Sequence, residues 1–180
     1  KYRLQNLYRS GRGYLEQLMT KILGGRAAEE IVFGELTTGA GNDLDRVTEI
    51  AKKMVCSWGM SEAFGPMTIG KEQSEVYLGK ELIGRDVHSN ETAHLVDSEI
   101  RGFITRAYDK ALDILKKRRD LLEKLAAELF EKETLGTDEI FEFVLANIDD
   151  ADREQVLAKY EKARELRFEH SKKSAQEGQA

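Results

Sequence analysis

The sequence predicts an all-α protein, a helix bundle with a partly irregular middle segment that leaves room for one short β-hairpin. The 180 residues contain a single proline and are rich in Glu, Lys, Leu and Ala, which favours helices. Apolar residues also recur three and four positions apart along most of the chain, as one face of a helix requires. A chain of this length can bury a core of its own, and we expect one main domain.

The overall composition excludes several classes of protein. A formal net charge of -5 argues against general nucleic-acid binding, which usually requires a basic face. The single cysteine, Cys56, excludes an internal disulfide framework and fits a reducing compartment such as the cytosol. No apolar run approaches the roughly 20 residues that span a bilayer, and no signal peptide is evident. Because the first residue is lysine rather than methionine, we expect a piece of a longer protein.

The first third of the chain predicts two helical regions separated by a turn. An apolar periodicity runs over residues 14–33 and is interrupted by the pair Gly24-Gly25. Such glycines are usually accepted where another backbone approaches closely. Gly34 is a stop signal, and the Thr/Gly-rich segment TTGAGND follows it. The next helix is expected from about residue 43 to residue 58, with Gly59 ending it.

The remainder predicts a long connection and further helices. Residues 59–90 hold the only proline and most of the remaining glycines, with short apolar pieces at 67–69 and 76–78 as the candidate strands. Helices are then expected from the N-cap Ser89 to about Lys117, through Leu121–Phe130 after a bend, from Thr137 through Leu145, and from Asp149 or Asp150 to about His170. The last ten residues are polar and are expected to lack fixed structure.

The two acids of the segment TTGAGNDLD fall on different sides of the predicted helix. A rotation of about 100° per residue places Asp43 with Val47 and Ile50 on the apolar arc, and Asp45 opposite. We therefore expect the carboxylate of Asp43 to point towards whatever the helix packs against. Two interpretations stay open. Asp43 is either a first-turn acid beside an Asn42 N-cap and Asp45 at the third helical position, or a metal ligand or catalytic carboxylate at a pocket edge.

A second charged cluster, Arg26, Glu29 and Glu30, precedes the turn. Arg26 lies three and four residues before the two acids, so ion pairs along the helix are within reach. One interpretation is a structural ion-pair network at a helix junction. The other is a supporting set of residues that orients a metal ligand or a catalytic group.

The rest of a catalytic site is missing from the residues. The three histidines, His88, His94 and His170, belong to no His-Glu-x-x-His motif, and Thr92 stands where the inverted zinc motif needs its second histidine. We expect these histidines at the surface. Cys56 has no histidine placed to activate it as a nucleophile. The segment TTGAGND lacks the Gly-Lys-Ser/Thr ending of a P-loop, so it is not a phosphate-binding loop.

Two long motifs resemble the FtsH family of membrane-bound, ATP-dependent zinc metalloproteases. They are LGGRAAEEIVFGE and TTGAGNDLDRVTEIAKKMVCSWGMSEAFGP, and the pieces VYLGKE, HSNETAHLVDSEI and LAAELFEKETLGTDEI follow in the order and spacing of the family. The similarity covers roughly residues 14–146. It implies a mostly helical peptidase domain that follows an AAA ATPase module, which binds ATP and Mg²⁺. It also implies a homo-hexamer that serves protein quality control.

The resemblance gives Asp43 a role. In the family, a His-Glu-x-x-His helix supplies two Zn²⁺ ligands and the general base, and the Asp of the GAxND motif supplies the third ligand. The matching residue here is Asp43. Arg26, Glu29 and Glu30 would then support the metal ligand, and the chain itself would hold no catalytic residue. The His-Glu-x-x-His helix would lie upstream of residue 1, so the chain alone is expected to bind zinc weakly or not at all and to be inactive.

The resemblance also implies a setting for the chain. We expect residues 1–146 to be the C-terminal portion of the metallopeptidase domain and residues 147–180 to be a charged helix and tail. Segments absent from this chain would anchor the parent in a membrane, with this domain on the cytoplasmic, stromal or matrix side. The substrates would be unfolded or membrane proteins. The alternative is a non-proteolytic helical oligomerisation or adaptor module derived from the same family.

Overall fold

The computed structural model describes residues 10–69, 89–161 and 164, and all regular structure in them is helical. The elements are α1 (Arg12–Ile22), α2 (Gly24–Phe33), the 3-10 turn η2 (Thr38–Ala40), α3 (Gly41–Cys56), α4 (Asn90–Lys117), α5 (Arg119–Lys132) and α6 (Thr137–Ala146). Residues 150–161 form a further helical stretch. The all-α prediction is confirmed. The candidate strand at 67–69 is irregular, and the piece at 76–78 and the polar tail lie outside the described residues.

The chain divides into two compact units, Lys1–Lys117 and Arg118–Ala180. This boundary after Lys117 differs from the predicted end of the peptidase segment at residue 146. The end at residue 146 stays a prediction.

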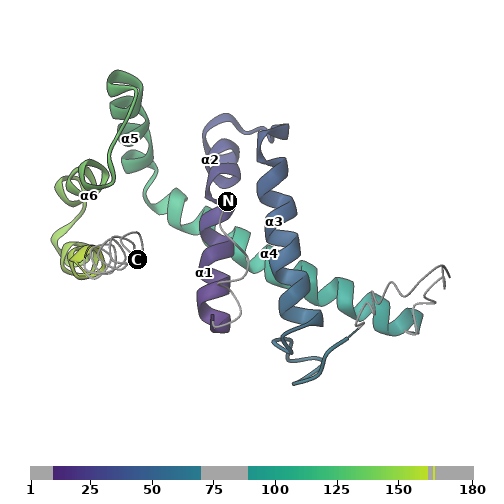
Figure 1. Cartoon of the computed structure of the whole chain (residues 1–180). Helices are drawn as coiled ribbons and strands as arrows, with labels where there is room; N and C mark the ends of the chain where they lie inside the picture. The colour runs from purple at the N-terminus through teal and green to yellow at the C-terminus, as the bar shows by residue number, and fades with distance from the viewer. Residues whose placement is uncertain (1–9, 70–88, 162–163, 165–180) are drawn as a thin grey trace, which may run out of the picture. The chain divides into compact units, whose positions relative to one another are not determined.

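Helix α4 is the common packing surface of the first unit. Helices α1, α2 and α3 each contact it, and α1 also contacts α3, as Figure 1 shows. The predicted apolar faces meet in one core of Leu15, Met19, Leu23, Val47, Ile50, Ala51, Met54, Val55, Ile69, Phe103 and Ala107. Phe103 of α4 is 2% exposed. The guanidinium carbons of Arg12 and Arg106 lie 5.2 and 4.7 Å from the centre of its ring, within the range of cation–π attraction.

The break between α1 and α2 falls at Leu23, one residue before the glycine pair. The expected close approach of another backbone is wrong among the described residues, because no backbone atom outside the helix itself lies within 4 Å of a Cβ placed on Gly24 or Gly25. The two glycines instead open α2, where their cost is lower than in a helix interior. Gly34 ends α2 as predicted. Its φ of 70° is left-handed, and its N–H donates to the carbonyl of Glu30.

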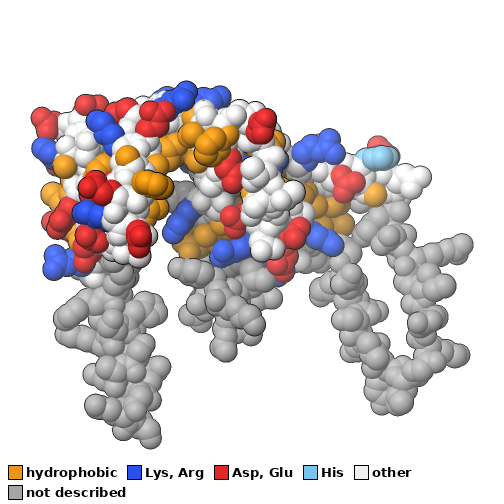
Figure 2. Space-filling view, turned by 90° about the horizontal axis from the view of Figure 1, so that it is seen from above, with side chains coloured by type: hydrophobic (Ala, Val, Ile, Leu, Met, Phe, Trp, Pro, Cys, Tyr) orange, Lys and Arg blue, Asp and Glu red, His pale blue; other side chains and the backbone are white. Residues whose placement is uncertain are grey.

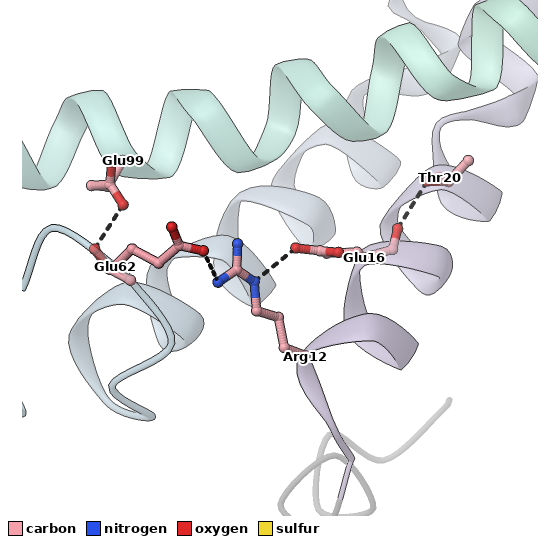
Figure 3. A network of polar contacts seen from close by, with 6 residues as sticks. Arg12, Glu16, Thr20, Glu62 and Glu99 are labelled. Atoms are coloured by element: carbon pink, nitrogen blue, oxygen red, sulfur yellow. Dashed lines mark hydrogen bonds and ion pairs between the residues drawn. The ribbon is translucent and has the colours of Figure 1, made fainter. Parts of the chain in front are cut away.

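The segment that follows α3 is fastened to α1 and α4 by polar contacts, which Figure 3 shows from close by. The hydroxyl of Ser61, which is buried, donates to Glu99 Oε2 on α4 at 2.7 Å. Glu62 accepts a hydrogen bond from Arg12 Nη1 on α1 at 2.8 Å. Further along, the N–H of Ile69 donates to the carbonyl of Cys56 at 2.8 Å. The predicted irregular connection therefore has defined contacts as far as residue 69.

Helix α2 packs against α4, and polar contacts of Tyr108 join the two helices. Ala27 is fully buried, and the hydroxyl of Tyr108 on α4 donates to Glu30 Oε2 at 2.5 Å. Burial and then the Glu30 carboxylate raise the pKa of Tyr108 to about 12, although Arg26 lowers it. The bond keeps the hydroxyl protonated and connects residues that are 78 positions apart in the chain.

In the second unit, residues 150–161 pack with α6. The rings of Phe141 and Tyr160 lie 4.4 Å apart, and the guanidinium of Arg153 donates to the carbonyl of Leu145. Arg118 forms ion pairs with Asp149 and Asp152. The predicted helix after residue 149 is confirmed as far as the described residues reach, and its predicted end near His170 lies outside them.

Replacing Phe103 with alanine is expected to lower the free energy of unfolding by about 3–5 kcal/mol, since the large buried ring would leave a cavity. The matched control is Phe33→Ala at the end of α2, where the side chain is 73% exposed. This control should change the free energy by less than about 0.5 kcal/mol. Chemical denaturation measures both variants. Equal losses of unfolding free energy in Phe103→Ala and Phe33→Ala would contradict the central place of Phe103 in the core.

Tyr108→Phe is expected to change how stability depends on pH. An unfolded tyrosine loses its proton near pH ~10, whereas folded Tyr108 has a pKa of about 12. Its contribution is therefore complete below pH ~10 and is lost between about pH 10 and pH 12. The difference in unfolding free energy between wild type and variant should shrink across this window. Tyr14→Phe serves as the control for general alkaline effects. If the difference in unfolding free energy between wild type and Tyr108→Phe stays constant from pH ~10 to pH ~12, the raised pKa of Tyr108 is contradicted.

Candidate functional site

Asp43 lies in the first turn of α3, at the end of the helix that is joined to α2 (Figure 1). Helix α3 begins at Gly41, and the N-cap position falls on Ala40, whose side chain makes no capping bond. The predicted N-cap role of Asn42 is therefore wrong. The 3-10 turn η2 runs directly into the helix, and the N–H of Gly41 already donates to the carbonyl of Thr38.

The side chain of Asp43 is exposed, whereas Val47 and Ile50 on the same arc are fully buried. The prediction that the side chain of Asp43 points into a packed interface is wrong. The prediction that Val47 and Ile50 on the same arc are buried is correct. A helical wheel gives the direction of a side chain, but burial also needs a neighbouring element. Among the described residues, α3 is buried on this face from Val47 onwards, and in its first turn Leu44 packs against the core whereas Asp43 is exposed. Asp45 is exposed, as predicted.

The cluster Arg26, Glu29 and Glu30 is half-buried on α2. The two carboxylates accept hydrogen bonds from hydroxyl groups on other elements. Glu29 Oε2 accepts from Thr37 Oγ1 at 3.0 Å, and Glu30 Oε2 accepts from Tyr108. Arg26 lies close enough to Tyr108 to lower its pKa. The two acids thus have different hydrogen-bond partners: Glu29 binds the turn that leads to Asp43, and Glu30 binds α4.

Thr37 and Tyr108 are partners that the sequence patterns did not reveal. Thr37 carries a local signal, because a threonine two residues before a turn glycine can accept from its N–H. Its hydroxyl does accept from the N–H of Gly39, at 3.3 Å. Tyr108 carries no local signal, since its partner Glu30 lies on a distant part of the chain.

The remaining candidates make no site with Asp43 among the described residues. His94 is exposed on α4, as expected, while His88 and His170 lie outside the described part of the chain. Cys56 is half-buried, and burial raises the pKa of its thiol, although Lys52 lowers it. Raising that pKa keeps the sulfur protonated and weakens it as a nucleophile. Figure 2 shows acidic and basic side chains interspersed over the face viewed from above.

Whether these residues can bind a zinc ion depends on how many ligand side chains they bring together. Within residues 10–69 and 89–161, no three His, Cys, Asp or Glu residues gather in a group that could hold a metal. A catalytic zinc site needs three protein ligands and an open position. These residues therefore do not form a zinc site by themselves, and Asp43 can supply one oxygen ligand.

Across the same described ranges, none of the helices combines the length and the apolar character needed to cross a membrane.

Comparison with known proteins places the motifs in a family. Peptidase family M41 matches residues 5–143. The chain is 46% identical to the ATP-dependent zinc metalloprotease FtsH of Thermotoga maritima over 136 residues, which are 76% of this chain and 22% of that protein. It is 46% identical to the ATP-dependent zinc metalloprotease FtsH 3 of Symbiobacterium thermophilum over 137 residues, 76% of this chain and 22% of that protein. It is 40% identical to the FtsH of Magnetococcus marinus over 141 residues, 78% of this chain and 21% of that protein.

The chain spans about a fifth of the length of these curated relatives. The family match includes the cluster on α2, the turn at Thr37 and Asp43, and it ends before the helical residues 150–161. The resemblance to the FtsH family is thereby confirmed, and the chain belongs to peptidase family M41.

Proposed function

We propose that the chain is part of an ATP-dependent zinc metalloprotease, in which Asp43 supplies one of the zinc ligands. The observation that carries this proposal is the 46% identity to zinc metalloproteases named FtsH over 136 residues. That similarity supports the proposal that the exposed acid at the start of α3 has a chemical role.

The exposure of Asp43 fits this task. A carboxylate that completes a metal site together with residues from elsewhere in the parent must be reachable from outside its own helix. The other two ligands and the general base would come from a His-Glu-x-x-His helix upstream of Lys1. The chemistry that such a site supplies when zinc is bound is activation of water for the hydrolysis of peptide bonds. The contribution of this chain is to hold one carboxylate at a defined place.

The remaining expectations belong to the parent. ATP and Mg²⁺ would bind an upstream ATPase module, and the parent would assemble as a homo-hexamer that degrades unfolded and membrane proteins. Segments outside this chain would anchor it, with this domain on the cytoplasmic, stromal or matrix side. Residues 1–146 would complete the peptidase domain, and the family match that ends at residue 143 supports this extent. Residues 147–180 would be an added helix and tail.

The coding sequence before Lys1 separates this proposal from the alternative adaptor module. A His-Glu-x-x-His motif within the preceding hundred or so residues, a span on the scale of one domain, would support the protease. Absence of both histidines there would favour a non-proteolytic oligomerisation or adaptor module.

Asp43→Asn in the full-length protein is expected to abolish proteolysis and to lower zinc affinity. The loss should exceed the roughly 10–100-fold effect typical of residues that only support a ligand, because a neutral amide replaces a charged ligand. Zinc content and degradation of an unfolded protein measure the two effects, and retained ATP hydrolysis shows that the protein is folded. Asp45→Asn, two residues away and also exposed, is the matched control. Intact zinc content in Asp43→Asn would remove Asp43 from the metal site.

A further inference from the structure

We infer that Thr37 is a positioning residue for Asp43, acting through a chain of hydrogen bonds from Glu29 on α2 to the start of α3. The inference rests on the proposed role of Asp43 as a zinc ligand. It gives a task to a residue that is itself no metal ligand.

The start of α3 lacks the usual means of fixing a helix end. Its N-cap residue is Ala40, which has no side-chain donor or acceptor, and no side-chain cap is formed. An uncapped first turn is prone to fray, because its N–H groups have no partner within the helix. What precedes the helix is η2, whose own N-cap is Thr37. The geometry of the first turn of α3 therefore depends on how η2 is held.

The hydroxyl of Thr37 holds η2 from two sides. It accepts a hydrogen bond from the N–H of Gly39 at 3.3 Å and donates its proton to Glu29 Oε2 at 3.0 Å. One hydroxyl can do both, since it has one donor and two acceptor positions. The bond to a carboxylate is the stronger of the two kinds, because the acceptor is charged. Thr37 thus joins the turn to α2.

Helix α2 is a firm support for this contact. Ala27 is fully buried, and Glu30, next to Glu29, is held by Tyr108 of α4. A carboxylate on a helix that is packed and tied to α4 can fix an exposed turn, whereas a carboxylate on a mobile loop could not. The bonds therefore run from α4 through α2 to Thr37 and the turn.

The packing around Gly39 agrees with this path. A Cβ at Gly39 would lie 3.3 Å from Thr37 Oγ1 and 3.9 Å from Glu29 Oε1. Gly39 therefore lies beside both members of the hydrogen-bonded pair, and the space next to its Cα is limited by the Thr37 hydroxyl. Asp43 follows four residues later.

The hydrogen bonds of Thr37 are important if Asp43 is a metal ligand, because a metal ligand must be held in a defined position. Ligand distances in a metal site are held within about ±0.2 Å, and residues that orient a ligand change metal affinity when they are lost. An exposed acid in an uncapped first turn would otherwise sample a wider range of positions. Loss of the Thr37 hydroxyl should therefore weaken zinc binding without unfolding the protein.

The test compares three variants of the full-length protein. Thr37→Val removes the hydroxyl and keeps the shape, Thr37→Ser keeps the hydroxyl, and Thr38→Val makes the same change one residue later. Thr38 contributes its backbone carbonyl, which this substitution retains. Zinc affinity is measured by competition between the protein and a fluorescent chelator. We expect roughly 10-fold weaker binding for Thr37→Val, at the lower end of the range for supporting residues, and wild-type binding for the other two.

Hydrogen exchange on the zinc-free protein gives a readout independent of the metal and of activity. Peptides that cover residues 37–45 should exchange faster in Thr37→Val, because the N–H of Gly39 loses its acceptor and the first turn of α3 opens. Peptides from the core of α3 and α4 should be unchanged. Glu29→Gln should act in the same direction, and the double variant with Thr37→Val should be no weaker in zinc binding than Thr37→Val alone, since both changes break one path.

Each outcome decides one claim. Wild-type zinc affinity in Thr37→Val, or equal loss in Thr38→Val, would overturn the positioning role. So would additive losses for Glu29→Gln and Thr37→Val. Asp43→Asn measured alongside separates the two proposals. If it keeps its zinc, the role of Asp43 fails and the inference about Thr37 fails with it. If it loses zinc while Thr37→Val does not, only the inference about Thr37 fails.

Discussion

The burial of one face of α3 against α1 and α4 is the constraint on which the first unit depends. Val47, Ile50, Ala51, Met54 and Val55 are all fully buried along that face. Each of the larger side chains gains about 1.5–3 kcal/mol by leaving water, so rotating α3 about its axis would cost most of this stabilisation. Because α3 is a continuous helix of 16 residues, the same burial sets the direction in which its first turn extends. The place of Asp43 begins with this packing.

Burial sets the axis of α3 and extends to Ala40 and Leu44 at its start, but it does not cover the side chain of Asp43. Asp43 lies one turn before Val47, where the described neighbours of α3 no longer cover it. Polar contacts take over at this point, from Glu29 through Thr37 to the turn. A hydrogen bond contributes about 0.5–1.5 kcal/mol, much less than the core. Such contacts can therefore adjust the position of a side chain without deciding the fold.

Local signals in the sequence predicted some helix ends correctly, although the N-cap predicted at Asn42 was wrong. Gly34 ends α2, and the hydroxyl of Ser89 caps α4 by accepting from the N–H of Thr92 at 3.2 Å. Apolar spacing also identified the buried face of α3. It failed for Asp43, because periodicity contains no information on how far the packing partner extends. Contacts between distant segments, such as Tyr108 with Glu30, have no local signal and need the fold first.

In the proposed metal site, one ligand lies on one packed segment and its partner ligands lie on another. The distance between them then depends on every contact that joins the two segments, and not only on the residues that touch the metal. For the proposed ligand Asp43, two kinds of contact carry this dependence. A change in the core alters the free energy of unfolding of the whole unit. A change at Thr37 alters the position of one turn while the core is intact. Metal affinity that falls at unchanged global stability therefore distinguishes a positioning contact from a packing contact.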